Sequence, residues 1–359
     1  MRVTHDLTSL TETVAFLVSI MVLAQACADE GLFEVLGGHM SRLAAGSSTR
    51  LLAWSIGLAT AVTAVLSLDA TVVLLTPILI AATGLSPHRS HAYASVRIAN
   101  SGSTLLPVSN LTNLLVFGAT GLTFVGFTWA MLPVWVVAVA AEYAVLRWWF
   151  RSELRETYEP PTGEAYAVPL FPVAVVMVVL FALASGLTPW LPALAGAILV
   201  SGYALMRRNS TWTDLIEAAN IPLAAFVLVW ALAVAWLATT RFGEWFDDTM
   251  PSGTSLGALL VIALIAMVAA NIVNNLPATL LLLPAAAAAG PVAVLALLIG
   301  VNVGANLTLI GSLANLLWRQ SGGRTLSSAR EFHVLGFATT PLIVVVCTVV
   351  LWAWTSLIW

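Results

Sequence analysis

The sequence predicts an all-α polytopic membrane protein, and three observations support this fold class. Of the 359 residues, 60% are hydrophobic and only 9% are charged, whereas about 25% of a soluble domain is charged. Several apolar runs reach the ~20 residues that cross a bilayer as a helix. These runs do not alternate over ~10 residues, as membrane β-strands do. The N-terminus shows no cleavable signal peptide, and the two cysteines, Cys27 and Cys347, are too few for a disulfide framework.

Single helices are predicted to cross the membrane in six places. Each stretch is predominantly apolar and has about the ~20 residues that a crossing requires. The six stretches lie at 10–28, 124–149, 169–187, 188–206, 221–239 and 333–358.

Two longer apolar stretches, 51–84 and 254–290, do not fit a single crossing. Each exceeds thirty residues and carries polar groups near its middle, "LSLD" in the first and "NIVNN" in the second. Two half-length helices that meet at a polar tip account for this pattern. Each stretch is therefore predicted to be a re-entrant helical hairpin.

Two further stretches, 88–120 and 291–318, have polar centres that contain glycine. These centres read "NSGSTLLPVSNLTN" and "NVGANLTLIGSLAN", and they predict transmembrane helices that are broken in mid-membrane. Backbone that leaves the helix at that depth is tolerated only where protein or a watery cavity covers it. With these two spans, the prediction is eight full crossings and two hairpins.

The arginines support this topology, because the chain has no lysine and its arginines segregate. With both hairpins re-entrant, one side of the membrane receives only Arg2 and Arg241. The positive-inside rule makes the other side cytoplasmic. Both termini are then predicted to lie outside, and the first hairpin enters from the cytoplasm and the second from outside. The cytoplasmic arginines are Arg42, Arg50, Arg89, Arg147, Arg151, Arg155, Arg207, Arg208, Arg319, Arg324 and Arg330.

The two halves of the chain are predicted to be inverted repeats. A gapless alignment of 99–115 with 301–317 gives seven identities in seventeen positions; chance similarity between leucine-rich helices is the alternative. The first repeat is 1–150, a cytoplasmic linker follows at 151–168, and the second repeat is 169–359. Three crossings precede the second hairpin and only one precedes the first, so the first repeat is predicted to lack two N-terminal helices. The aligned pairs include Asn100 with Asn302, Asn113 with Asn315 and, at the hairpin tips, Ser67 with Asn274. Inverted repeats with paired broken helices are typical of secondary transporters.

Asp69 lies at the predicted tip of the first hairpin, with no charged residue within fifteen positions on either side. An ionised carboxylate near the middle of the membrane costs several kcal/mol unless it is paired or solvated. One interpretation is a proton or cation relay, and the other is a cap for the half-helix that follows. Arg97 is the second isolated charge. It either pairs with Asp69, meets an anionic substrate or extends to the cytoplasmic surface.

The hairpin tips and broken-helix centres offer helix ends, backbone groups, small amides and hydroxyls. Such groups suit a neutral polyhydroxy solute or a small cation, and hydrogen bonding between helices is the structural alternative. No metal-ligand cluster, phosphate loop or nucleotide fingerprint occurs, so neither a cofactor nor a metal is predicted. The candidate substrate-binding residues are Ser67, Thr71, Asn100, Ser103, Ser109, Asn110, Asn113, Asn274, Asn275, Asn302, Asn306, Thr308, Ser312 and Asn315.

These motifs resemble those of the ion transporter superfamily, which includes dicarboxylate–sodium symporters, sodium–proton antiporters and arsenite efflux permeases. "LLPVSNLTNLL", "NNLPATLL" and "LTLIGSLANLLW" look most like the arsenite/antimonite efflux permease family. That family typically has Asn-Asp-Gly at the first tip, where this chain has Leu68-Asp69-Ala70, and a threonine where this chain has Asn315.

The resemblance implies a secondary active transporter, with proton-coupled efflux of arsenite or antimonite across the cytoplasmic (inner) membrane by alternating access. Asp69 and Arg97 would then serve proton or cation coupling, with sodium as the other candidate ion. The implied partners are the lipid bilayer, a soluble ATPase subunit and a second copy in a homodimer, and no nucleic acid. The alternatives are a sodium–proton antiporter, a sodium-coupled carboxylate transporter, and a non-transporting membrane subunit on a degenerate transporter fold.

Overall fold

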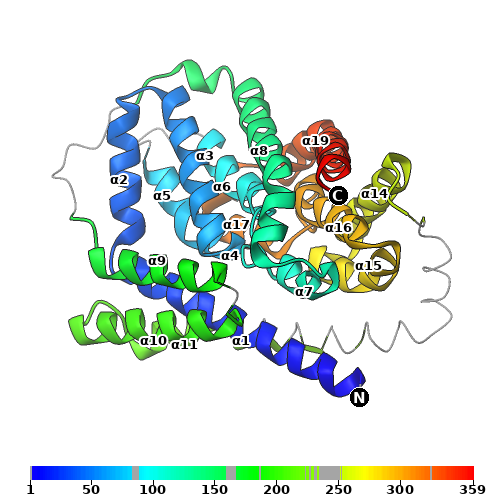
Figure 1. Cartoon of the computed structure of the whole chain (residues 1–359). Helices are drawn as coiled ribbons and strands as arrows, with labels where there is room; N and C mark the ends of the chain where they lie inside the picture. The colour runs from blue at the N-terminus through cyan, green and yellow to red at the C-terminus, as the bar shows by residue number, and fades with distance from the viewer. Residues whose placement is uncertain are drawn as a thin grey trace. The chain divides into compact units, whose positions relative to one another are not determined.

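The computed structural model of the chain is almost entirely helical. It describes residues 2–82, 89–158, 167–185, 187–222, 224–225, 228–229, 233, 251, 253–323 and 326–359. Within these residues there is no β-strand, and one isolated bridge joins Ser47 to Thr157. The predicted all-α class is therefore confirmed (Figure 1).

Five of the described helices are long and apolar enough to cross a membrane. They are α3 (Ser48–Val65), α8 (Phe124–Trp149), α10 (Trp190–Arg207), α14 (Leu256–Val273) and α19 (Ala329–Ile358). A sixth span results if residues Val14–Asp29 of α1 (Arg2–Asp29) form one crossing with α2 (Leu32–Ala44), to which they are bent by 61°. Gly31, with a φ of 78°, lies at this bend. The chain is therefore a multi-pass membrane protein.

Most of the predicted crossings coincide with described helices. The stretches at 10–28, 124–149, 169–187, 188–206 and 333–358 fall on α1, α8, α9 (Leu170–Ala184), α10 and α19, in that order. The stretch at 221–239 lies largely outside the described residues. The total of eight crossings therefore stays a prediction.

The contacts between residues divide the chain into two compact units. Unit 1 consists of Met1–Ala99, Tyr143–Ala224 and Leu317–Leu326. Unit 2 consists of Asn100–Glu142, Ala225–Leu316 and Ser327–Trp359. The predicted repeats, 1–150 and 169–359, follow sequence similarity rather than contacts, and they stay a prediction.

In unit 1, α1 packs along α10 and against the short helix α11 (Trp212–Ala218), and α9 packs against α10. Gly196 on α10 permits a close approach, because a Cβ there would lie 2.6 Å from the Cγ2 of Val179 on α9. The remaining helical segments of this unit are α4 (Leu68–Ala70), η1 (Thr71–Leu75), α5 (Thr76–Ala81), the first part of α6 (Arg89–Gly102), η2 (Glu153–Arg155) and η4 (Arg319–Gly323).

The first predicted tip is a break between helices. α3 ends at Val65, and Ser67, with a φ of 155°, precedes α4. The Ser67 hydroxyl accepts a hydrogen bond from the Ala70 N–H at 3.2 Å and so caps the new helix. The helix then widens to a π-helical turn over Thr71–Leu75, just before Pro77. Pro77 has no backbone N–H to donate to the Val73 carbonyl one turn earlier, which interrupts the α-helical pattern. The re-entrant path of residues 51–84 stays a prediction.

Unit 2 is organised around α16 (Pro291–Asn302), which is apolar on every side except at its end. Every residue from Val292 to Asn302 is buried. An all-round apolar helix of this kind belongs in a core, and α14, α15 (Asn275–Ala289), α19 and α7 (Leu111–Thr120) contact it (Figure 1). Gly300 permits the contact with α14, because a Cβ there would collide with the Ala263 carbonyl.

The second predicted tip is also a break, at Asn274 between α14 and α15, where φ is 81°. Both predicted broken helices are interrupted as well. Helix α6 ends at Gly102 and α7 begins only at Leu111. On the other side, α16 continues as the 3-10 turn η3 (Val303–Leu307), and α17 (Leu313–Trp318) follows after five further residues. The sequence therefore located all four breaks, while their depth in the bilayer stays a prediction.

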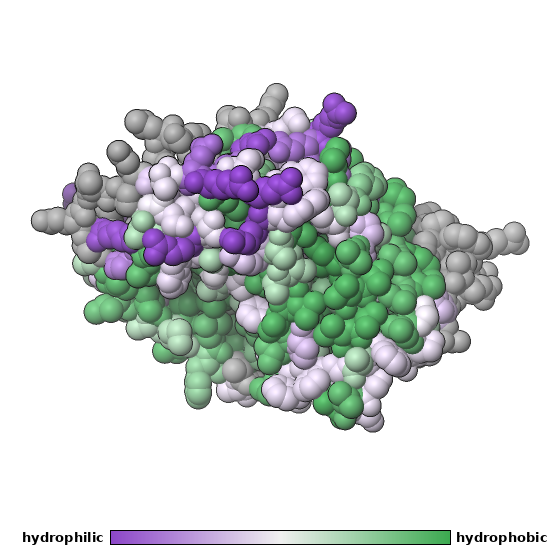
Figure 2. Space-filling model, turned by 90° about the horizontal axis from the view of Figure 1, so that it is seen from above, coloured by the Kyte–Doolittle hydropathy of each residue, from purple (hydrophilic) through white to green (hydrophobic). Residues whose placement is uncertain are grey.

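The exposed surfaces of several helices are apolar, as contact with lipid requires. On α9 the exposed side chains include Met177, Val178 and Phe181, and on α10 they include Ile198 and Met206. Figure 2 shows wide hydrophobic areas on the face in view.

Candidate functional site

The end of α16 and the start of α7 meet in a buried cluster of amides in unit 2. Asn302 Oδ1 accepts hydrogen bonds from Asn110 Nδ2 at 2.9 Å and from Thr112 Oγ1 at 2.7 Å. Asn302 Nδ2 donates to Asn113 Oδ1 at 2.7 Å. All four side chains are at most 3% exposed, so these bonds join groups that could not stay unpaired without a large cost.

A second cluster joins Asn100 to the other broken helix. Asn100 Nδ2 donates to Asn306 Oδ1 at 2.9 Å and to Asn315 Oδ1 at 2.7 Å. Asn306 Nδ2 in turn donates to the Ser101 hydroxyl at 3.0 Å and to Glu142 Oε1 at 3.1 Å. The Ser101 hydroxyl donates to the same carboxylate oxygen at 2.8 Å. The cluster is therefore a continuous buried network that includes one carboxylate.

The two clusters use the same bonds at aligned positions. Asn113 Nδ2 donates to the carbonyls ten and seven positions before it, at 2.7 and 2.9 Å. Its aligned partner, Asn315, donates to the carbonyls ten and seven positions before it, each at 2.8 Å. The exchange is also reciprocal, since Asn302 donates to Asn113 and Asn100 donates to Asn315. The sequence alignment therefore paired residues that have the same structural role.

Small polar side chains also begin the half-helices after each break. Asn110 Oδ1 accepts from the Thr112 N–H at 3.2 Å at the start of α7. Ser312 Oγ accepts from the Asn315 N–H at 3.2 Å at the start of α17. Ser103, in the first break, accepts from Asn110 Nδ2 at 3.3 Å. These residues have structural roles in addition to any contact with a solute.

The tip between α14 and α15 contacts the second break directly. Asn274 Nδ2 donates to the Ile310 carbonyl, and the Asn275 N–H donates to the Gly311 carbonyl, each at 3.0 Å. Asn271, one turn earlier on α14, accepts from the N–H and the hydroxyl of Thr308 at 2.9 and 2.8 Å. The tip and the break are therefore held together by hydrogen bonds.

Unit 2 brings together most of the residues that the sequence predicted. They are Asn100, Ser103, Ser109, Asn110, Asn113, Asn274, Asn275, Asn302, Asn306, Thr308, Ser312 and Asn315. Ser67, Thr71, Asp69 and Arg97 belong to unit 1.

Five residues that take part in these hydrogen bonds were not among the predicted site residues: Ser101, Thr112, Glu142, Asn271 and His333. Glu142 lies near the end of the predicted crossing at 124–149, five positions before Arg147, yet its side chain is fully buried. Asn271 lies in the motif "NIVNN" and could have been included, because it is polar within an apolar helix. His333 on α19 accepts from the Leu309 N–H at 3.3 Å, and no motif distinguishes it.

In unit 1, Asp69 borders a cavity of about 330 Å³. The residue is 8% exposed and has no hydrogen-bond or ion-pair partner among the described residues. Ser67, not Asp69, caps the short helix, so the capping interpretation does not explain this carboxylate. The Thr71 hydroxyl, a predicted substrate-binding group, forms a hydrogen bond with the Thr63 hydroxyl at 2.8 Å.

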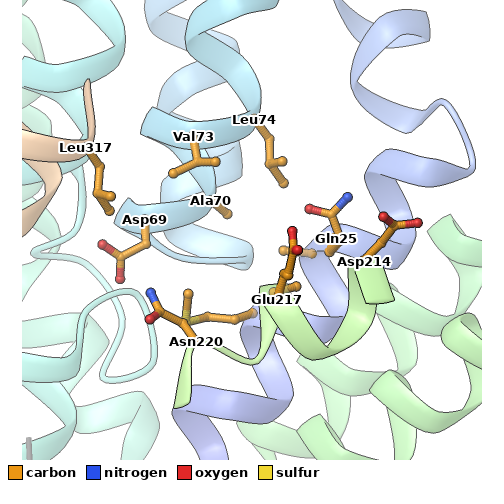
Figure 3. Close-up of a pocket in the computed structure, with 12 residues that line it drawn as sticks. Gln25, Asp69, Ala70, Val73, Leu74, Asp214, Glu217, Asn220 and Leu317 are labelled. Atoms are coloured by element: carbon orange, nitrogen blue, oxygen red, sulfur yellow. The ribbon is translucent and has the colours of Figure 1, made fainter. Parts of the chain in front are cut away.

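Side chains from three parts of unit 1 line the same cavity. Figure 3 shows Asp69 on α4, Gln25 on α1, and Asp214 and Glu217 on α11, with the Asn220 side chain directed toward Asp69. The lining residues are Met21, Ala24, Gln25, Asp69, Ala70, Val73, Leu74, Asp214, Glu217, Ala218, Asn220 and Leu317.

Arg97 is 1% exposed in the chain as a whole. It forms no ion pair with Asp69, since that carboxylate has no partner among the described residues. No group of three or more histidine, cysteine, aspartate or glutamate side chains in the described part of the chain could hold a metal ion.

The interrupted helices, the buried amide networks and the long apolar helices define a membrane transporter of the class built from broken helices. Comparison with protein families agrees. Residues 7–295 match the CitMHS family, described as "Citrate transporter", and the chain belongs to this family.

Its relatives include arsenical pumps. The chain is 28% identical over 339 residues to the "Arsenical pump membrane protein" of Escherichia coli (strain K12), covering 85% of this chain and 77% of that protein. It is 27% identical over 331 residues to the protein of the same name from Yersinia enterocolitica, with the same coverage. The crystal structure of the Alcanivorax borkumensis YdaH transporter, described as having an unusual topology, matches with a TM-score of 0.65 at 15% identity, over 99% of this chain and 88% of that one. This last match supports the fold alone.

Proposed function

We propose that the chain exports arsenite or antimonite across the cytoplasmic membrane by alternating access, coupled to proton entry. The observation that carries the proposal is the paired amide network of unit 2, in which two broken helices present the same donors and acceptors at aligned positions. The arsenical pumps among its relatives agree with this substrate.

Amides and hydroxyls suit a neutral solute. Arsenous acid is uncharged near neutral pH and presents several hydroxyl groups, as a small polyol does. A site of asparagine, serine and threonine side chains can match such groups without having to offset a buried charge. Capture by thiolates would need clustered cysteines, whereas Cys27 and Cys347 are both free and buried in different units.

Asp69 is the coupling residue in this proposal. It is a buried carboxylate without a partner among the described residues, and it borders a cavity that a cation can occupy. Binding of a proton removes the cost of the unpaired charge. The free-energy cost of the ionised carboxylate depends on its surroundings. Where the surroundings differ between two conformations, protonation favours one conformation over the other.

The decisive experiment compares substrates in proteoliposomes under an imposed pH gradient. Arsenite, citrate and a dicarboxylate are each offered with and without sodium. The proposal expects arsenite flux that depends on the pH gradient and not on sodium. Flux of citrate or the dicarboxylate without any flux of arsenite would contradict the proposal.

The role of Asp69 is tested by Asp69→Asn. We expect this variant to lose flux driven by the pH gradient, because an amide cannot bind and release a proton at this position. The protein should remain in the membrane, since the asparagine has nearly the same shape. The control for folding is that the variant is expressed in the membrane and stays monodisperse in detergent, as the wild type does. Flux driven by the pH gradient at the wild-type rate would refute the role.

Sodium-coupled carboxylate transport is the second candidate, and two observations favour it. The family is described as "Citrate transporter". Arg97 is a buried cation on α6, three positions before Asn100, and an arginine is suited to bind a carboxylate. The test measures whether citrate inhibits arsenite flux. Inhibition in the wild type that disappears in Arg97→Gln would support carboxylate transport over arsenite export.

A further inference from the structure

We propose that the cavity at Asp69 is a cation-binding entrance on the side of the protein that carries α11, which the predicted topology makes cytoplasmic, and that Asp214 and Glu217 of α11 concentrate small monovalent cations there in front of the Asp69 carboxylate. The inference rests on the proposed coupling role of Asp69 and adds residues and a ligand class to it. No motif in the sequence distinguishes Asp214 or Glu217. The cavity volume of about 330 Å³ is large enough for a hydrated cation.

The polar groups around the cavity favour a cation. Three carboxylates line it, from Asp69, Asp214 and Glu217, and the described residues of its lining include no arginine, lysine or histidine. The described basic side chains on the elements packed against α4 and η1 are Arg50 on α3 and Arg319 on η4, and neither lines the cavity. An anion would therefore be repelled.

The amide groups of the lining add to this preference. Gln25 Nε2 donates to Asp29 Oδ1 at 2.7 Å, which uses the donor end of that side chain. Figure 3 shows the Gln25 oxygen on the side of Glu217. Asp29, at the end of α1, brings a further negative charge close to the same wall.

Asp69 is the group to which a cation would bind. Its side chain is more than nine-tenths buried, borders the cavity and lacks a protein partner among the described residues. Asp214 and Glu217 are exposed, so they are solvated and cost little to keep ionised. A buried binding group behind two exposed charges of the same sign is an arrangement that raises the local concentration of cations.

The local structure holds Asp214 in place without neutralising it. The N–H and the hydroxyl of Thr211 both donate to Asp214 Oδ2, at 2.9 and 2.7 Å, in the capping box that begins α11. Both donors of this box are uncharged. The charge therefore remains available to attract a cation, and it falls at the helix start, where an acidic side chain is stabilised.

The experiment uses the full chain in proteoliposomes, runs the exchange in reverse, and measures arsenite flux against the concentration of the driving cation on the side that α11 faces. One arm varies the pH without sodium, and the other varies sodium at constant pH. The variants are Glu217→Gln alone, which leaves the capping box intact, and Asp214→Asn with Glu217→Gln. Glu156→Gln is the matched control, because Glu156 is an exposed acidic residue of the same unit that does not line the cavity.

We expect the double variant to need about two- to fivefold more of the driving cation for half-maximal flux, with the maximal flux retained. Glu217→Gln should give part of this shift and Glu156→Gln none. Raising the ionic strength with N-methyl-D-glucamine chloride from about 0.01 to 0.15 M shortens the Debye length from ~30 to ~8 Å. This change should raise the cation concentration needed for half-maximal flux more in the wild type than in the double variant.

The outcomes separate the two proposals. If Asp69→Asn abolishes coupling while the double variant behaves as the wild type does, the entrance is overturned and the coupling role of Asp69 stands. If Asp69→Asn keeps wild-type coupling, the coupling role itself fails. The arm in which the half-maximal concentration shifts identifies the cation as the proton or sodium.

Discussion

At the scale of single residues, amide side chains decide the structure of unit 2 because each satisfies more than one backbone or side-chain group. Asn315 is the clearest case. Its Nδ2 donates to two main-chain carbonyls and its Oδ1 accepts from Asn100. An asparagine is the smallest side chain that can do both.

Asn315→Asp tests this role. The carboxylate cannot donate, so the Ala305 and Thr308 carbonyls both lose the bond from this side chain, and among the described residues only Thr308 keeps another donor, the Gly311 N–H. A buried group left unsatisfied costs about 1–3 kcal/mol. We expect a lower melting temperature in detergent and little transport. Thr213→Ala, at an exposed position, should leave the melting temperature within about 1 °C, since such surface changes are usually small. An unchanged melting temperature for Asn315→Asp would show that these bonds contribute no net stability.

Residue-scale prediction from the sequence succeeded where a polar side chain stands alone in an apolar run. Asp69 and the asparagines of the breaks were found for that reason. Glu142 was missed because it lies close to Arg147 in the sequence, where an acidic residue usually marks the membrane surface. Only the fold shows that its carboxylate accepts from Ser101 and Asn306.

At the scale of helices, the sequence composition predicted where the helices break, but it did not predict which helices pack closely against each other. Glycine and asparagine in an apolar helix favour an interruption, so the four breaks were located from the sequence. In contrast, nothing in the sequence indicated that α14 approaches α16 at Gly300, where a Cβ would meet the Ala263 carbonyl. The pairing of helices depends on such contacts between distant residues.

Gly300→Ala should therefore destabilise unit 2. The added methyl group forces α16 away from α14, and overpacking of this kind costs about 1–3 kcal/mol. The matched control is Gly257→Ala on α14, where a Cβ meets no atom within 4 Å. That change should be neutral or stabilise the helix by up to about 1 kcal/mol. Thermal unfolding in the same detergent compares the two, and equal effects would mean that the close approach is not a constraint.

At the scale of the whole molecule, the predicted topology places Ser152 inside and Ser356 outside, because five crossings separate them. If residues 254–290 crossed the membrane instead of re-entering it, the number would be six and both serines would lie on one side. The sidedness of these two positions therefore tests the second hairpin. Both side chains are exposed, and the native cysteines Cys27 and Cys347 are buried.

Single substitutions Ser152→Cys and Ser356→Cys make this measurement with a membrane-impermeant maleimide on intact cells. We expect Ser356→Cys to react at once, because the positive-inside rule places the C-terminus outside. Ser152→Cys should react only after the cells are permeabilised, and the wild type should react in neither case. Reaction of both variants in intact cells, or of neither, would contradict the five crossings predicted between these positions, as a membrane-spanning 254–290 would. The reverse pattern would keep the hairpin but invert the orientation of the chain, so that α11 and its carboxylates would face the outside.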